Sequence, residues 1–413
     1  MSRARRILFF AEAVTLAHVA RPIVLAKGLG NGLDRERYDV FMACHARYQR
    51  FLADEPWQTL PLDSISSPQF LRALASGSPV YDVPTLRRYV KEDLALIERV
   101  QPDLIVGDFR LSLSVSARLA GIPYATVTNA YWSPYYTMRR FPLPVLPLTR
   151  FLPLPVARQL FGLAQPFAFG LHCQPLNLVR KENGLPGLGN DLRRVYTDAD
   201  HVLYADAPQM FPVDPLPAHH HYLGAILWSP PVALPDWWHR LPADKPIVYL
   251  TLGSSGAASL LPTVLQALAD LPVTVIASTA GASLPGPPPA NAFVADYLPG
   301  TEAASRAQLV ICNGGSPTSQ QALAAGVPVL GIASNMDQFM NMVPVQGAGA
   351  GLMLRADRIN TNQVRQACEI LLDPSVGKAA AQRLRSRVAL QDKPAAQVFE
   401  AAVAGLLKLP ARP

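Results

Sequence analysis

Short apolar runs alternate with helical segments along most of this chain, and this alternation constrains its fold more than any other feature. In the first half, Ile7–Ala11, Asp103–Gly107 and Tyr124–Thr128 indicate buried strands, with helical patterns between them. The same alternation of strand and helix patterns resumes at Pro246–Thr251. Strands that alternate with helices favour parallel sheets that helices cover on both faces. We therefore predict an α/β protein built from doubly wound parallel sheets.

The chain has 413 residues, which is more than a domain with a single hydrophobic core usually contains, and this length fits two domains. A proline-rich stretch with three consecutive histidines separates the two βα regions, and we interpret it as a solvated linker. A metal site at these histidines is the less favoured alternative. The predicted boundaries are 1–210 for an N-terminal domain, 211–245 for the linker, 246–394 for a C-terminal domain and 395–413 for a final helix, whose return to the N-terminal domain is left open.

Charge and cysteine usage narrow the possible functions. The 37 Lys plus Arg exceed the 30 Asp plus Glu, but no basic run is interleaved with aromatic residues, so we do not expect nucleic acid as a partner. The four cysteines are widely spaced without a CxxC motif, and we predict neither a metal site nor disulfides. No long apolar run predicts a transmembrane helix. We expect a cytoplasmic protein and leave open a peripheral contact with the inner face of the membrane.

Prolines interrupt the stretch from Tyr131 to Pro175, which is also rich in Leu, Phe and Arg. Because proline breaks helices, we predict short helices and loops here. Two interpretations stay open: the stretch lines an apolar acceptor pocket or touches a membrane surface, or it packs as an ordinary core insertion. The first interpretation selects Tyr131, Trp132 and Tyr135 as acceptor-site residues, and the arginines that would face lipid phosphates are Arg139, Arg140, Arg150 and Arg158.

The most informative segment runs from residue 311 to residue 351. A buried strand ends at Cys312, a turn of small residues follows, and Ser316 opens a helix. Such a turn exposes backbone N–H groups at the positive end of the helix dipole, which suits a diphosphate. Asp337 and Gln338 follow the next strand on a predicted loop, where ligands bind in open parallel sheets. An ordinary βα turn is the alternative interpretation.

This segment resembles the nucleotide-sugar signature of the UDP-glycosyltransferase superfamily, whose pattern is roughly HGGxGTxxEALxxGVPxxxxPxxxDQxxNAxxxxxxGxG. The residues that match in register are Gly314, Gly315, Thr318, Ala322, Leu323, Gly326, Val327, Pro328, Asp337, Gln338, Asn341, Gly349 and Gly351. The resemblance implies a GT-B fold, with two Rossmann-like domains facing across a cleft, and a nucleotide sugar as co-substrate in place of a cofactor. It also implies which residues bind the donor: the diphosphate at Gly314, Gly315, Ser316 and Thr318, and the sugar hydroxyls at Asp337 and Gln338.

Three residues depart from the family pattern. Asn313 stands where the family has a His that touches the diphosphate, and Gln321 stands where a Glu holds the ribose. Pro317 replaces a glycine and removes one backbone donor. Neutral amides hydrogen-bond without the assistance of a charge. The donor base therefore stays open between UDP and dTDP sugars, and a non-catalytic nucleotide-sugar or lipid-binding relative stays open as the alternative function.

Two further donor elements resemble the family. After the strand that ends near Thr251, Ser254 and Ser255 occupy a turn where they could bond a phosphate. Tyr297 precedes Pro299, near the place where an aromatic residue of the family stacks on the base. An ordinary strand-end turn and a half-buried core tyrosine are equally weighted alternatives.

The acceptor side is expected around His18, which follows the first strand and enters a helix. Its segment resembles the family's GHxxPxxxLAxxL, with Ala17 in place of Gly and Pro22 one place late. In that pattern the His is the base that deprotonates the acceptor. Asp108, at the end of the strand DLIVGD, is the expected partner, because a carboxylate at one ring nitrogen fixes the tautomer and stabilises the imidazolium. A structural histidine and a helix cap at Asp108 are the alternatives.

Together these features predict an inverting, metal-independent glycosyltransferase. It would move a sugar from a nucleoside-diphosphate donor to a hydroxyl of a hydrophobic or aromatic small molecule or lipid. Helix amides near Gly314 would stabilise the leaving diphosphate. A nicotinamide-dependent oxidoreductase is the rival enzyme class, but its G-x-G-x-x-G motif directly follows a strand, whereas Gly28, Gly30 and Gly32 follow a helix.

Overall fold

The structure is a computed structural model that describes residues 3–30, 37–52, 55–138, 140–253, 256–389 and 394–408. The chain divides into two compact units. Unit 1 comprises Met1–Arg139, Leu160–Ile226 and Gln391–Pro413, and unit 2 comprises Arg140–Gln159 and Leu227–Leu390.

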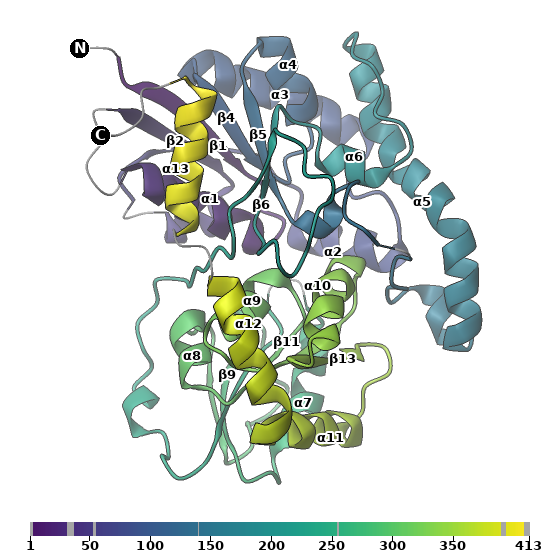
Figure 1. The fold of residues 1–413 in the computed structure, drawn as a ribbon, viewed down its shortest axis with the longest axis vertical. Coiled ribbons are helices and arrows are strands. Elements are labelled where there is room, and N and C mark those ends of the chain that lie inside the picture. The colour runs from purple at the N-terminus through teal and green to yellow at the C-terminus, as the bar shows by residue number, and fades with distance from the viewer. Residues whose placement is uncertain are drawn as a thin grey trace. The chain divides into compact units, whose positions relative to one another are not determined.

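Unit 1 is built on a parallel sheet of seven strands in the order β3-β2-β1-β4-β5-β6-β7 (Figure 1). This order runs outward from β1 and then outward again from β4, so the sheet is doubly wound and its winding reverses between β1 and β4. The alternation predicted for the first half is confirmed. The strands are β1 (Arg5–Ala11), β2 (Tyr38–Cys44), β3 (Gln58–Pro61), β4 (Leu104–Asp108), β5 (Tyr124–Thr128), β6 (His201–Tyr204) and β7 (His220–Tyr222).

Helices of unit 1 follow from capping and apolar periodicity. The Asp82 side chain accepts a hydrogen bond from the backbone N–H of Thr85, and Pro84 lies in the first turn, so α3 begins at Val83. The helices are α1 (Ala17–Gly30), α2 (Ser67–Ser76), α3 (Val83–Val100), α4 (Leu113–Ala120), α5 (Leu154–Glu182, with residues 160–182 in unit 1), α6 (Leu192–Tyr196) and α13 (Ala395–Leu406).

The last helix, α13, belongs to unit 1 and packs beside α1 (Figure 1, yellow). The side chain of Phe399 is fully buried, and its ring lies 5.9 Å from the ring of Phe9 in β1. Gly28 permits the close approach of the two helices, because a Cβ at this position would lie 2.5 Å from the Cβ of Ala396. The missing side chain at position 28 is therefore what lets α13 reach the core of unit 1.

We expect Gly28→Ala to destabilise unit 1 by about 1–3 kcal/mol, because overpacking forces helices apart. The matched control is Gly162→Ala in α5, where an added Cβ meets nothing within 4 Å and is expected to be neutral or to stabilise by up to about 1 kcal/mol. Chemical denaturation measures both effects, and limited proteolysis of the C-terminal segment reports the release of α13. Equal stability of the two variants would contradict this packing.

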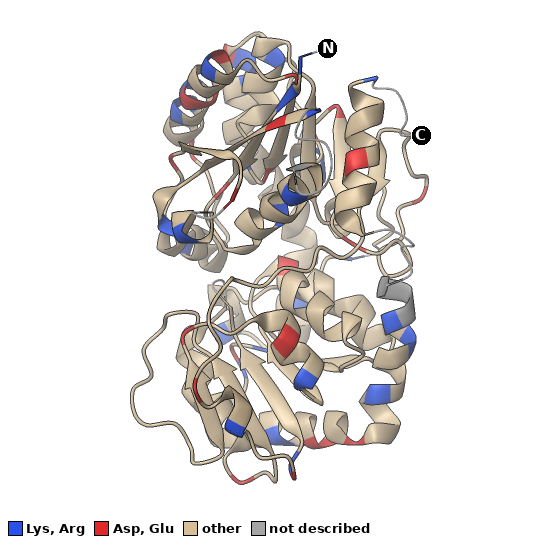
Figure 2. Ribbon diagram, turned by 90° about the vertical axis from the view of Figure 1, so that its left-hand side faces the viewer, with Lys and Arg blue, Asp and Glu red and all other residues tan. Residues whose placement is uncertain are grey.

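Unit 2 is built on a second parallel sheet, with the order β10-β9-β8-β11-β12-β13. Apart from Arg355, its strands carry no Lys, Arg, Asp or Glu, and Figure 2 shows them almost entirely tan. Strands buried on both faces have this composition. The strands are β8 (Ile247–Thr251), β9 (Thr274–Ser278), β10 (Ala292–Ala295), β11 (Leu309–Cys312), β12 (Val329–Ala333) and β13 (Gly351–Arg355).

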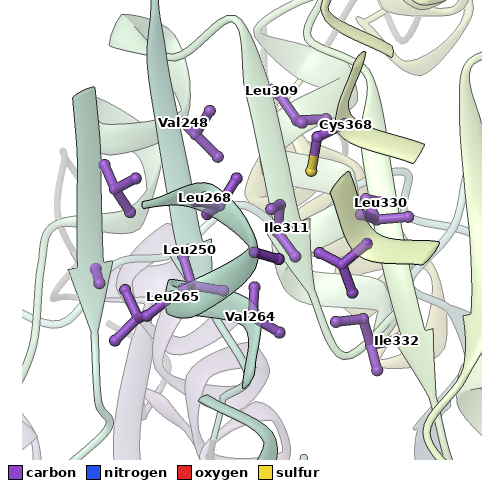
Figure 3. Close-up of a cluster of buried hydrophobic side chains, with 14 of the residues drawn as sticks. Val248, Leu250, Val264, Leu265, Leu268, Leu309, Ile311, Leu330, Ile332 and Cys368 are labelled. Carbon is purple, nitrogen blue, oxygen red and sulfur yellow. The ribbon is translucent and has the colours of Figure 1, made fainter. Parts of the chain in front are cut away.

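One hydrophobic core joins this sheet to helices of unit 2. Figure 3 shows Leu250, Ile311 and Leu330 from three neighbouring strands beside Val264, Leu268 and Cys368 from two helices. Burial raises the pKa of the Cys368 thiol to about 12, as expected for a packed and unreactive side chain. The helices are α7 (Leu261–Leu268), α8 (Gly300–Arg306), α9 (Ser316–Ala324), α10 (Met336–Gly347), α11 (Thr361–Leu372) and α12 (Ala379–Ala389).

From Leu154 onward, one long helix replaces the short helices predicted after Tyr131. Helix α5 continues for 29 residues through Pro166 and Pro175. Each proline removes a backbone hydrogen bond and disfavours the helix. Phe169 and Cys173 on one side of α5 are nevertheless buried, and this packing outweighs the local preference. The prediction of short helices and loops was therefore wrong from Leu154 onward, whereas it is confirmed for the described residues of 131–153, where the short helix Pro147–Arg150 lies between loops.

The segment 140–159 groups with unit 2, although the sequence analysis placed it in the first domain. A guanidinium nitrogen of Arg355 donates to the backbone oxygen of Leu143 at 2.6 Å. The hydroxyl of Thr149 donates to a carboxylate oxygen of Asp357 at 2.7 Å. These partners are about two hundred positions apart in the chain, so no local pattern reveals them.

The run of three histidines contributes to a strand, so its interpretation as a solvated linker was wrong. Strand β7 pairs with β6, and His220 is buried with Nδ1 2.6 Å from the hydroxyl of Tyr204. Burial, followed by the neighbouring His219 and His221, lowers the pKa of His220 to about 4. Within the described ranges, no group of three or more His, Cys, Asp or Glu side chains could hold a metal ion. None of the helices in those ranges has the length and apolar character of a membrane-spanning segment.

Candidate active site

Two titratable side chains of unit 1 meet where the winding of the first sheet reverses. Asp108 is the last residue of β4, and His18 is the second residue of α1, which follows the neighbouring strand β1. Nδ1 of His18 lies 2.8 Å from Oδ1 of Asp108. Ligands of open α/β sheets bind at such a reversal, beyond the carboxyl ends of the strands. The pair therefore occupies the position at which this fold places reactive groups.

Arg21 joins this pair, and the sequence analysis missed it. Its Nε and one Nη donate to the two oxygens of Asp108 at 2.7 and 2.8 Å, which is the bidentate geometry of a strong ion pair. The same Nη lies 2.9 Å from Nδ1 of His18. Arg21 is 7% exposed and Asp108 is fully buried. Arg21 follows His18 by three residues, so the helical period already placed both on one face.

The polar network continues to the segments after β5 and β6. A guanidinium nitrogen of Arg21 donates to the side-chain oxygen of Asn129 at 3.0 Å. The amide nitrogen of Asn129 donates to Asp206 at 3.1 Å, and the backbone N–H of Ala130 donates to the same carboxylate at 2.6 Å. All of these side chains are buried, and donors satisfy both carboxylates of the network. The network holds the start of the segment that carries Tyr131 and Trp132.

A group of aromatic rings extends from the imidazole of His18. It stacks on Phe109 at 4.7 Å between centroids and an angle of 17°. The backbone of Phe109 has a φ of +59°, a conformation that bulky residues seldom adopt away from functional sites. Its ring lies 5.9 Å from Phe70 and 5.6 Å from Tyr196, and Tyr196 meets Trp132 edge-on at 5.0 Å. Trp132 is thus the predicted acceptor residue that reaches this aromatic group.

The other two predicted acceptor residues point in different directions, although the ring of Tyr131 lies 6.4 Å from that of Trp132. Tyr131 is fully buried and packs in the core, 5.2 Å from the ring of Phe211. Tyr135 is exposed and lines a separate cavity of about 480 Å³, together with Arg194 and His219. Of the three, only Trp132 contacts the aromatic group that begins at His18.

A second cluster lies where the winding of the other sheet reverses, after β11. Gly314 has a φ of +79°, and a Cβ at this position would lie 2.8 Å from Cγ of Met342, so only glycine fits the turn. Helix α9 begins directly afterwards at Ser316, with Gly315 as its N-cap. In the described part of the chain, no side chain caps this helix. The first backbone N–H groups of α9 have no partner within the helix, and they lie at the positive end of the helix dipole.

Side-chain amides hold this glycine turn in place. The oxygen of Asn313 accepts a hydrogen bond from the backbone N–H of Gly315 at 2.9 Å. The amide nitrogen of Asn341 donates to the backbone oxygen of Gly314 and to the hydroxyl of Ser319, each at 2.8 Å. Asn341 is buried in α10 and was not among the predicted site residues, although it matches the family pattern. It fixes the direction in which the turn presents its N–H groups.

Comparison with known proteins identifies the family of the chain. The family model described as "Erythromycin biosynthesis protein CIII-like, C-terminal domain" matches residues 262–404. The chain is 53% identical to a PGL/p-HBAD biosynthesis glycosyltransferase of Mycobacterium tuberculosis, over 93% of this chain and 89% of that relative. The chain belongs to the UDP-glycosyltransferase superfamily.

A PGL/p-HBAD biosynthesis rhamnosyltransferase of Mycobacterium bovis is also 53% identical, over 93% of this chain and 84% of the relative. The solved structure of spinosyn rhamnosyltransferase SpnG complexed with thymidine diphosphate has a TM-score of 0.67 at 18% identity and covers 96% of this chain and 99% of its own. The fold is therefore GT-B, and the protein is a glycosyltransferase.

In this glycosyltransferase a second turn adjoins the glycine turn. Gly253, after β8, has a φ of +63°, and a Cβ there would lie 3.4 Å from the amide nitrogen of Asn313. Strands β8 and β11 are neighbours, so their carboxyl ends bring the two turns together. Ser254 and Ser255, the predicted phosphate-binding serines, lie outside the described residues.

Gln321 and Tyr297, two further predicted donor residues, lie near the start of α8. The side-chain amide of Gln321 donates to the backbone oxygen of Trp228, and a Cβ at Gly300 would lie 2.7 Å from its side-chain oxygen. Tyr297 is half-buried three residues before Gly300, and its hydroxyl donates to the backbone oxygen of Ala280 at 3.3 Å. The glutamine is thus held in place by the backbone around it.

Asp337 and Gln338 lie in the first turn of α10, so the loop predicted for them was wrong. Gln338 is buried, and its side-chain oxygen accepts a hydrogen bond from the backbone N–H of Ser334 at 2.8 Å. With Asn335 it forms a reciprocal capping box that begins the helix. Asp337 is half-buried in the same turn, and Thr318 is half-buried in α9. A capping box explains why this pair forms a helix start rather than a loop.

Proposed function

We propose that this glycosyltransferase moves a sugar from a UDP or dTDP sugar to a hydroxyl of a hydrophobic or aromatic acceptor, either a small molecule or a lipid. The contact between His18 and Asp108 carries the proposal. The carboxylate holds a proton on Nδ1, which leaves the lone pair of Nε2 free to accept the proton of an acceptor hydroxyl. The names of the two mycobacterial relatives support an acceptor of PGL/p-HBAD biosynthesis, and one of them supports a rhamnosyl donor.

The proposed reaction is a single displacement with inversion. Nε2 of His18 takes the proton of the acceptor hydroxyl while the oxygen forms a bond to the anomeric carbon of the donor. The bond from that carbon to the diphosphate breaks, and its electron pair leaves with the nucleoside diphosphate. The N–H groups at the start of α9 would stabilise the departing charge, so the proposed reaction requires no metal ion.

Apolar contacts support the acceptor class. Phe109 stacks on His18, Tyr196 packs against Phe109, and Trp132 packs against Tyr196, so a row of aromatic rings begins at the imidazole. Rings arranged edge-to-face offer an aromatic substrate both stacking and edge contacts. The hydroxyl that lies nearest the imidazole would then be the one that is glycosylated.

Thermal denaturation with UDP, dTDP, GDP and NAD tests the donor assignment. A ligand that binds only the folded protein, at about 100 times its dissociation constant, stabilises it by about 2.7 kcal/mol. We expect a rise in melting temperature with UDP or dTDP and none with NAD. If all three nucleoside diphosphates leave the melting temperature unchanged, the proposed donor class is wrong.

Replacing Arg21 tests the ion pair that holds the proposed base. Lysine cannot form the bidentate contact with Asp108. We expect Arg21→Lys to lower kcat for sugar transfer by at least about tenfold, which equals about 1.4 kcal/mol of transition-state free energy. The KM for the donor is expected to stay unchanged, since the glycine turn of unit 2 is not altered. Steady-state kinetics of the wild type and of Arg21→Lys decide this, and a rise in donor KM at unchanged kcat would contradict it.

A further inference from the structure

Helix α5 (teal in Figure 1) has a buried side and an apolar side that faces solvent. Phe161, Phe169, Cys173 and Leu176 are buried. The apolar side chains opposite them recur at spacings of three, four and seven residues and are exposed, with Leu163 82% and Phe167 73% accessible. We call these residues the α5 stripe, and its members within unit 1 are Leu160, Leu163, Phe167, Leu171 and Leu178.

An exposed apolar row of this size is unusual for a water-facing helix. A surface helix of a globular protein carries charged or polar residues opposite its buried face. Between residues 160 and 178, α5 contains no Lys, Arg, Asp or Glu at all. Contiguous exposed apolar surface marks a contact with another molecule or a membrane. The α5 stripe therefore indicates a binding surface, and the charges near it indicate what binds there.

The chain near the stripe is basic and lacks acids. No Asp or Glu occurs from Arg140 to Lys181. Arg150 and Arg158 before the stripe are exposed, and so is Lys181, which follows Leu178 by three residues and thus shares its face. Positive charge beside exposed Leu and Phe is the pattern of a helix that lies in the interface of an anionic bilayer.

We propose that the α5 stripe docks this protein on the surface of a membrane that contains anionic lipids. Leu163 and Phe167 insert among the acyl chains near the headgroups, and Lys181 on the same face contacts the phosphates. The helix lies in the plane of the interface, because its other side is buried in unit 1 and only the stripe is exposed. This inference goes beyond the proposed sugar transfer, and membrane binding is tested separately from that reaction.

Vesicle flotation of the full chain tests the proposal. The probes are vesicles of phosphatidylcholine alone and of phosphatidylcholine with phosphatidylglycerol. The test variant is Leu163→Ser with Phe167→Ser, which changes only exposed side chains. The matched control is Leu119→Ser on α4, where the leucine is 42% exposed and lies outside α5. Circular dichroism and the rate with a water-soluble acceptor verify that the variants remain folded and active.

We expect the wild type and Leu119→Ser to float with the anionic vesicles, and the double variant to bind at least about tenfold more weakly. Added salt, or the change Lys181→Gln, should weaken the binding to anionic vesicles. Equal binding of the double variant, or no binding of the wild type to either vesicle, overturns the proposal. A second copy of the chain is the competing occupant. Light scattering that finds a wild-type dimer and a monomeric double variant, without flotation, would assign the stripe to that copy instead.

Discussion

Replacing His18 with glutamine is expected to lower kcat/KM for sugar transfer by about 10²- to 10⁴-fold, the range that a general base contributes. Glutamine keeps a polar side chain of similar size beside Asp108 but cannot take up a proton at neutral pH. His18 is partly exposed and is packed mainly through its stack on Phe109, so the variant should fold. Initial rates with a nucleotide sugar and an aromatic alcohol measure the loss.

Binding of the nucleoside diphosphate is the control for His18→Gln. The glycine turn after β11 is in unit 2 and the imidazole is in unit 1, so titration with the diphosphate should give the wild-type affinity. Loss of turnover with unchanged binding would locate the defect in the chemical step. Transfer by the variant at the wild-type rate would remove His18 from the mechanism.

Replacing Arg110 with methionine is expected to give the largest loss of stability, about 3–5 kcal/mol, because it leaves buried charges without their partner. Arg110 is fully buried, and its guanidinium donates to Glu12 at 2.9 Å and to Asp93 at 3.0 Å. It also lies over the ring of Tyr89 at 3.6 Å. Urea denaturation measures the loss, and Arg99→Met on the exposed side of α3 serves as the control.

The loss at Arg110 should depend on pH in a defined direction. Burial raises the pKa of Glu12 and of Asp93, even though the charge of Arg110 opposes this rise. A carboxyl whose folded-state pKa is raised stabilises the fold below its unfolded pKa, and this contribution is lost as the pH rises through the folded value. The deficit of Arg110→Met should therefore grow from mildly acidic to alkaline pH. A deficit that shrinks over that interval would contradict this account of the buried carboxyls.

Much of the fold was predictable because its signals are local. Runs such as Ile7–Ala11 and Leu309–Cys312 are apolar on both sides, and this pattern indicates strands inside a parallel sheet. Asp108 ends such a strand and His18 opens the helix after its neighbour, so the topology alone brings them to one edge. The contact of 2.8 Å between them follows from this placement.

Other parts of the site depend on contacts between distant residues. Arg21 binds Asp108 across 87 positions, and although the helical period places it on the face of His18, no local pattern shows that it contacts Asp108. The prolines of α5 indicated breaks, yet a buried face of Phe and Leu holds the helix together. Gln338 matched a sugar-binding position by sequence, but its oxygen accepts the hydrogen bonds that begin α10. Tertiary packing decided the cases of Arg21 and α5, whereas a local capping box decided that of Gln338.

The position of α13 has a consequence for how the chain is made. Phe399, which fills the core beside Phe9, leaves the ribosome only after Leu227–Leu390 has been synthesised. Synthesis of unit 1 thus begins first and ends last, because the segments of unit 2 lie between those of unit 1 in the sequence. Domains generally fold as units during synthesis. Until Ala395–Leu406 has been synthesised, the surface of α1 that α13 covers stays exposed, and this exposed apolar surface is a binding site for chaperones.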